Sequence, residues 1–107
     1  MTPAHSFTVA PDDPSLDGHF PSRPVVPGVV LLDEALAAIA RETGFAAPVR
    51  LARVKFVSPV MPGEEVAVLL AEARGRSVSF ACAVGDRRVL SGVAEFPGEA
   101  AAGRDAA

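Results

Sequence analysis

The spacing of apolar residues changes near residue 48, and the two parts of the chain predict different elements. Between Pro27 and Gly44 apolar residues lie on nearly every face of a helix, and only Asp33 and Glu34 interrupt the first three turns. Proline is favoured in the first turn of a helix, and glycine is favoured directly after the last turn. A helix that is apolar on every side is normally buried, so this stretch predicts one long buried helix.

From residue 49 onward apolar and polar residues alternate, which is typical of strands with one face on a core. Together with a short N-terminal strand, the pattern predicts strands at residues 6–10, 49–60, 65–73, 77–84 and 87–96. We therefore predict an α+β domain in which a curved antiparallel sheet wraps around the helix, with its last four strands arranged as a meander. A second subunit could cover the part of the helix that the sheet leaves open.

Length and composition fit a single domain. The chain has 107 residues, half of them apolar, and a domain of this size often gains stability from dimerisation. We expect the domain to span residues 1–96, and the small and polar residues 97–107 to form a mobile tail. The longest apolar run, residues 25–32, is far shorter than a membrane span, and the N-terminus has no features of a signal peptide. The single cysteine, Cys82, which we place in the core, excludes an internal disulfide, so the expected location is cytoplasmic.

The charge of the chain narrows the choice of partner. The formal net charge is −3, and nine of the ten basic residues are arginines, which argues against nucleic acid as the main partner. Candidates for a local patch that binds an acidic protein are Arg23, Arg50, Arg53, Arg74, Arg76, Arg87 and Arg88. Two histidines and one cysteine at these spacings make no metal site, and we find no glycine-rich phosphate loop, so we expect neither a metal nor a cofactor.

The segment before the helix is the most informative part of the chain. HFPSRPVVPG, residues 19–28, holds three prolines and therefore predicts a rigid, extended loop. In context it reads GHFPSRPVVPGVVLLDEAL, which resembles the signature of the hot-dog-fold 3-hydroxyacyl-acyl carrier protein dehydratases. A second segment, KFVSPVMPGEEV at residues 55–66, is similar to a strand and turn of the same family. The resemblance covers roughly residues 6–96 and extends to the small dehydratases of aryl polyene synthesis.

This resemblance implies a hot-dog fold and a hydro-lyase of fatty acid biosynthesis or related lipid metabolism. Such an enzyme reversibly removes water from a 3-hydroxyacyl group on acyl carrier protein and leaves a trans-2-enoyl thioester. His19 and Asp33 match the two catalytic positions, which the family places in different subunits, so a homodimer or an oligomer of dimers is implied. Ser22 and Ala37 stand where the family usually has a glycine and an amide, and these departures bear on the substrate range.

The residue types suit this chemistry. Dehydration needs a base for the α-proton, an acid for the departing hydroxyl, and donors for the charge on the thioester oxygen. His19 is a suitable base near neutral pH. Asp33 has apolar neighbours one turn away on the helix, which we expect to desolvate the carboxyl and keep it protonated. The free N–H of Gly28, at the helix N-terminus, would bind the oxyanion. Weaker candidates for the substrate tunnel or for carrier docking are Phe20, Arg23 and Val29.

Each of these residues also has a purely structural interpretation. His19 could be a surface loop residue, Asp33 could cap or pair with a nearby group, and Gly28 could simply start the helix. We interpret Glu34, which points about 100° away from Asp33, as solvated or ion-paired. His5, near the N-terminus, is expected to be exposed.

Two other functions stay open at this point. An acyl thioesterase could share the fold, although such enzymes usually lack the HFP and PG arrangement. A non-catalytic hot-dog subunit could bind acyl chains or stabilise a partner dehydratase. Retention of both His19 and Asp33 favours the enzyme, because a subunit without catalysis has no physical need for a buried carboxyl.

Overall fold

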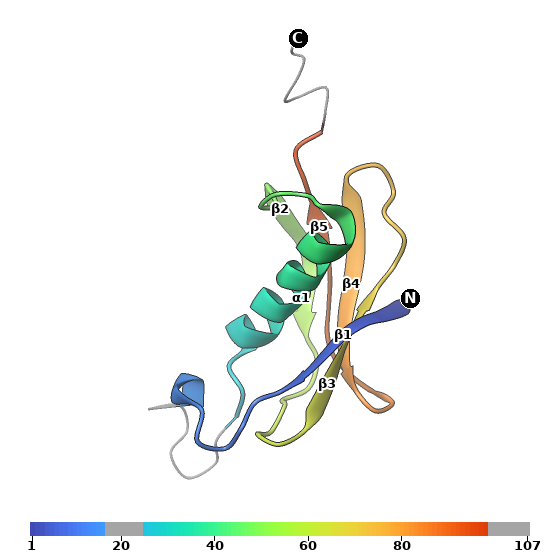
Figure 1. The fold of residues 1–107 in the computed structure, drawn as a ribbon. Coiled ribbons are helices and arrows are strands. Elements are labelled where there is room, and N and C mark those ends of the chain that lie inside the picture. Colours follow the sequence, from blue (N-terminus) through green and yellow to red (C-terminus); the bar gives the residue numbers. More distant parts are fainter. Residues whose placement is uncertain (17–24, 99–107) are drawn as a thin grey trace.

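Five strands and one α-helix occur in the part of the chain that the computed structural model describes, residues 1–16 and 25–98 (Figure 1). In chain order the elements are β1 (Thr2–Thr8), the short 3-10 helix η1 (Pro14–Leu16), α1 (Gly28–Thr43), β2 (Arg50–Phe56), β3 (Glu65–Leu70), β4 (Ser77–Val84) and β5 (Arg87–Glu95). The helix has the borders predicted from the sequence, and so does β4. Most of the predicted tail, residues 97–107, lies outside the described residues.

The strands form one antiparallel sheet in the order β1-β3-β4-β5-β2. β3, β4 and β5 follow one another as a meander, as predicted. The prediction that β2 opens this meander is wrong, because β2 pairs with β5 at the edge of the sheet and not with β3. Eight residues separate β2 from β3, among them Pro59 and Pro62. A connection of this length and composition has no need to fold back as a tight hairpin, so β3 is free to pair elsewhere.

β2 departs most from the alternation expected for residues 49–60. It ends at Phe56, and its register against β5 shifts between Ala52 and Lys55. Arg53, inside this bulge, has a φ of 53°. A bulge inserts an extra residue into one strand and re-aims the side chains around it, so the strict two-residue period ends here.

The helix α1 lies across one face of the curved sheet (Figure 1). Gly44 ends it in the left-handed conformation, with a φ of 76°, and donates its N–H to the Ala40 carbonyl at 2.8 Å. The buried residues of the helix are Leu31, Ala35, Ala38 and Ile39. They belong to one core with Phe80 of β4 and Leu90 of β5. A curved antiparallel sheet packed around one helix is the hot-dog fold that the resemblance implies.

The opposite side of α1 is open in the single chain, and it is this part of the helix that the prediction left for a second subunit to cover. Val29 is 60% exposed, and Asp33, Ala37 and Ala40 are exposed as well. We call Val29, Asp33 and Ala37, which follow one another at four-residue spacing, the open side of α1. Within the described residues, no helix is both long and apolar enough to cross a membrane.

Candidate active site

The N-terminal end of α1 has backbone N–H donors of the kind that an oxyanion site requires. Gly28 is the first residue of the helix, and N–H groups in a first turn have no helical carbonyl to bind. Pro27 occupies the capping position and makes no side-chain hydrogen bond to the helix. The Val26 N–H donates to the Val60 carbonyl at 2.8 Å and fixes the chain just before this turn. The Gly28 N–H thus lies at the positive end of the helix dipole.

The ring of Phe56, the last residue of β2, packs against Gly28. A Cβ atom at position 28 would lie 2.7 Å from Phe56 Cε1 and 3.0 Å from Cδ1, so any larger residue would have to displace the ring. Packing therefore gives a second reason for glycine at this position. Phe56 is absent from the site residues predicted from the sequence, although it belongs to the KFVSPVMPGEEV segment that carries part of the resemblance.

Asp33 lies on the open side of α1 and is exposed. The expectation that Val29, Val30, Leu36 and Ala37 desolvate its carboxyl is wrong for the single chain. Val29 and Ala37 are themselves exposed, whereas Val30 and Leu36 pack against the core. Apolar neighbours on a helix exclude water only where another element covers the same face, and no described part of this chain covers it.

Three of the predicted site residues, His19, Phe20 and Arg23, lie outside the described residues. The approach of His19 to Asp33 in another subunit therefore stays a prediction. Val29, the remaining tunnel candidate, is directly after Gly28 and is 60% exposed, so it is available to a substrate or to a second subunit.

Glu34 has a polar partner, His5, whose contact with it has the geometry of an ion pair, one of the two states expected for Glu34. Its Oε1 lies 2.9 Å from Nε2 of His5, and the pair connects α1 to β1. The expectation of an exposed His5 is wrong: its side chain is half-buried, and its ring stacks on Phe7 at 6.0 Å between centroids. The two residues are 29 positions apart, and no local sequence pattern predicts such a pairing.

Cys82 is a core residue, as predicted. Its side chain is fully buried, and Sγ lies 4.0 Å from the Leu31 carbonyl oxygen. Burial, with a smaller contribution from the negative charge of Glu34, raises the pKa of the thiol to about 11. A neutral, enclosed thiol is not a nucleophile near neutral pH. Within residues 1–16 and 25–98, no three His, Cys, Asp or Glu side chains are placed to hold a metal ion.

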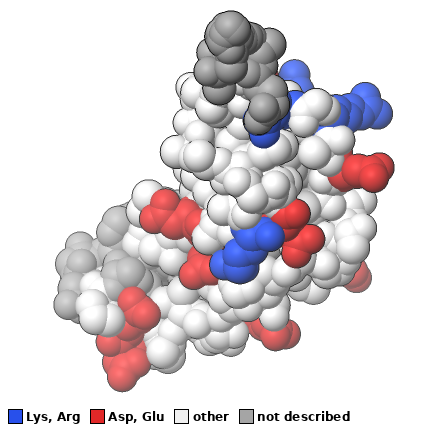
Figure 2. Space-filling model, turned by 45° about the horizontal axis from the view of Figure 1, so that its top comes forward, with Lys and Arg blue, Asp and Glu red and all other residues white. Residues whose placement is uncertain are grey.

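Some arginines proposed for carrier docking already have partners in the chain. Arg87 donates to Glu64 Oε1 at 2.9 Å. The Met61 N–H and this guanidinium together lower the pKa of Glu64. Arg76 lies over the Phe45 ring, 4.3 Å from its centroid. On the face shown in Figure 2, some basic side chains lie near one another at the upper right and another lies near the middle between acidic side chains, so the basic side chains do not form one continuous patch.

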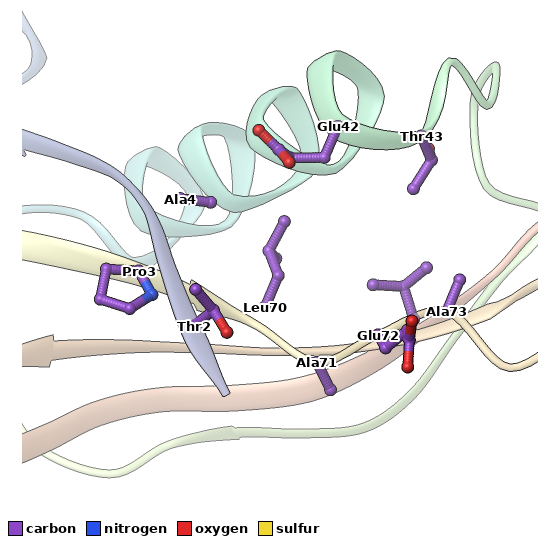
Figure 3. Close-up of a pocket in the computed structure, with 10 residues that line it drawn as sticks. Thr2, Pro3, Ala4, Glu42, Thr43, Leu70, Ala71, Glu72 and Ala73 are labelled. Atoms are coloured by element: carbon purple, nitrogen blue, oxygen red, sulfur yellow. The ribbon is translucent and has the colours of Figure 1, made fainter.

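A cavity of about 510 Å³ lies at the other end of α1 (Figure 3). Its lining includes Thr2 of β1, Glu42 of α1 and Glu72 just after β3. The helix rises about 21 Å between Gly28 and Glu42, so this cavity is remote from the predicted site. Asp33 of the predicted site faces outward along the open side of α1, where no described residue of the chain covers it.

Comparison with known proteins decides the family. The family model described as ApeI dehydratase, ApeI-like, matches residues 2–93. The chain belongs to the ApeI-like dehydratase family. The match spans every described element of this family member from β1 to most of β5, so the site residues on α1 and β2 fall inside it.

Individual relatives agree with this assignment. The 3-hydroxyacyl-[acyl-carrier-protein] dehydratase FabZ of Sinorhizobium fredii is 33% identical over 84 residues, which are 69% of this chain and 54% of that protein. This ApeI-like chain thus spans about half the length of the FabZ relative.

Solved structures support the hot-dog fold. The dehydratase heterocomplex ApeI:P from Xenorhabdus doucetiae gives a TM-score of 0.74 at 21% identity, and the match covers 85% of this ApeI-like chain and 82% of that chain. A MaoC-like dehydratase from Phytophthora capsici gives a TM-score of 0.68 at 22% identity, with coverage of 95% and 43% respectively.

Proposed function

We propose that this protein is a 3-hydroxyacyl-[acyl carrier protein] dehydratase, a hydro-lyase that uses His19 and Asp33 as its acid–base pair. The observation that carries the proposal is the shared position of two groups on α1. The N–H of Gly28 and the carboxyl of Asp33 both belong to the first turns of this helix. Side chains on a helix lean toward its N-terminus, so the Asp33 carboxyl leans toward the turn that starts at Gly28.

In the proposed reaction His19 removes the proton from C2 of the 3-hydroxyacyl thioester. The negative charge that develops on the thioester oxygen is stabilised by the Gly28 N–H and by the positive end of the helix dipole. The electron pair at C2 then forms the double bond as the C3–O bond breaks. Asp33 protonates the departing hydroxyl, so water and a trans-2-enoyl thioester result. In the reverse direction the same groups add water.

The exposure of Asp33 supports a second subunit in the working enzyme. Asp33 and Val29 face outward from the single chain, and the half-exposed ring of Phe56 packs against Gly28, which directly precedes Val29. A subunit seated on this side would exclude water from the carboxyl, which favours its protonated form. It could also bring its own His19 to Asp33, as the sequence resemblance implies. A homodimer, with acyl carrier protein as the donor of substrate, is therefore part of the proposal.

A subunit that supports a different catalytic chain is the second candidate. The likeness to a structure described as a heterocomplex, ApeI:P, favours it, and the open side of α1 suits a hetero partner as well as a second copy. In that case the isolated chain would bind but not convert enoyl thioesters, and adding the partner would restore turnover.

The test is hydration of crotonyl thioester, carried on acyl carrier protein or on coenzyme A, with the reaction monitored by the loss of enoyl absorbance. We expect His19→Ala and Asp33→Asn each to lower turnover by roughly 10²- to 10⁴-fold. Glu34→Gln is the matched control, because it alters the neighbouring carboxyl on a different side of α1, and it should keep activity. An inactive wild type, or activity in both catalytic variants with the dimer intact, would overturn the proposal.

A further inference from the structure

Phe56 is held in an unusual position for a half-exposed aromatic residue. Phe56 is 55% exposed, yet its ring lies so close to Gly28 that a Cβ atom at position 28 would be 2.7 Å from Phe56 Cε1. Its backbone is part of the sheet, where Phe56 pairs with the fully buried Leu90 of β5. The next residue, Val57, donates its N–H to the Val89 carbonyl at 2.9 Å. The base of the ring is therefore fixed by the sheet, and its tip lies beside the first residue of α1.

The neighbour of this ring is the residue whose N–H would bind the thioester oxygen. When the thioester oxygen accepts a hydrogen bond from the Gly28 N–H, the carbonyl carbon bonded to that oxygen also lies close to Gly28. The carbonyl carbon carries two other substituents, the sulfur and C2. The sulfur is the same in every carrier-linked substrate and bears no branch. Among the atoms next to the carbonyl carbon, a bulky group beside Gly28 can therefore discriminate between substrates through a branch at C2.

We propose that Phe56 determines specificity at C2, so that the enzyme accepts 3-hydroxyacyl thioesters unbranched at C2 and rejects those with a C2 methyl group. The inference rests on the proposed dehydratase function and adds a substrate class to it. The ring fills the position of a Cβ atom at residue 28, and in the proposed complex a methyl group at C2 of a thioester bound to the Gly28 N–H would meet the same ring. A snug apolar contact discriminates one methyl group by roughly 10- to 200-fold in kcat/KM.

The experiment compares hydration of trans-2-butenoyl and trans-2-methyl-2-butenoyl thioesters on the same carrier. The proteins are the wild type, Phe56→Leu and Phe56→Ala. Val57→Ala is the matched control, because Val57 is the next residue and is similarly exposed, at 59%. We expect Phe56→Ala to shift the ratio of kcat/KM values toward the branched substrate by at least about tenfold. Phe56→Leu should give an intermediate shift, and Val57→Ala should leave the ratio unchanged.

Each outcome has a separate meaning. An active wild type whose substrate ratio is the same in the Phe56 variants would overturn the role of Phe56 and leave the dehydratase proposal intact. A loss of activity on both substrates by the same factor would also overturn it, because a purely structural role predicts that result. A wild type that hydrates neither thioester would overturn the dehydratase function itself. If Phe56→Ala fails to fold by circular dichroism, the Phe56→Leu ratio decides the question.

Discussion

His5 Nε2 and Glu34 Oε1 lie 2.9 Å apart and connect the N-terminal strand to the central helix across 29 positions of sequence. Both side chains are about one-third exposed. Glu34 is the immediate neighbour of Asp33, yet it binds β1 while Asp33 faces outward. Two adjacent carboxyl groups on one helix thus have separate surroundings, one structural and one open to a substrate or a second subunit.

The first prediction concerns this pair. A double-mutant cycle with His5→Ala and Glu34→Ala should give a coupling free energy of about 0.5–1 kcal/mol near neutral pH, because the pair is only partly buried and solvent weakens it. Urea denaturation followed by circular dichroism measures the four free energies of unfolding. The two single variants and the double variant should largely keep the hydration activity of the wild type. A coupling near zero would mean that the contact contributes nothing to stability.

The second prediction concerns the contact between Gly28 and Phe56. Gly28→Ala should destabilise the fold by about 1–3 kcal/mol, because the new methyl group would lie 2.7 Å from the ring. In a Phe56→Ala background the same substitution should cost much less, since the ring is gone and alanine is the better helix former. The free energies of unfolding of the wild type, the two single variants and the double variant give the double-mutant cycle. Gly98→Ala is the control, since the nearest atom to its new Cβ is 4.0 Å away. Equal costs in both backgrounds would contradict the steric explanation.

The third prediction concerns the buried thiol. In the folded protein at pH 8, Cys82 should react with a disulfide reagent at least about 100-fold more slowly than in the urea-unfolded chain, because it is enclosed and protonated. Its raised pKa also affects stability at high pH. The ordinary pKa of the thiol, which applies to the unfolded chain, is 9.0, whereas the pKa in the folded protein is about 11. Ionisation therefore favours the unfolded state as the pH rises between these values. Cys82→Ala should lack this part of the loss of folding stability at alkaline pH. Fast labelling of the thiol in the folded protein would contradict its burial.

Features that depend on local chemistry could be predicted from the sequence. Pro27 and Gly44 mark the ends of α1 because the first suits a helix start and the second adopts the left-handed conformation that ends a helix. The strand at residues 77–84 has the predicted bounds, since turn residues flank it on both sides. The hot-dog fold and the family follow from motifs that lie within the matched residues 2–93.

Features that depend on distant contacts could not be predicted in this way. The sequence around Phe56 does not specify whether β2 pairs with β3 or with β5, because an eight-residue connection permits both. The pairing of His5 with Glu34 requires β1 to lie beside α1, which no local pattern encodes. Asp33 has apolar neighbours in sequence, but its exposure depends on what covers the open side of α1, and no described part of this chain covers it.

The two edge strands share a feature that affects how the protein behaves at high concentration. β2 has the bulge at Arg53, and β1 has a register shift between Pro3 and His5. Irregular edges that contain charged residues or proline are poor templates for further strands from other molecules. The sheet is therefore protected at both ends against open-ended growth into aggregates, even though one chain alone leaves apolar surface uncovered.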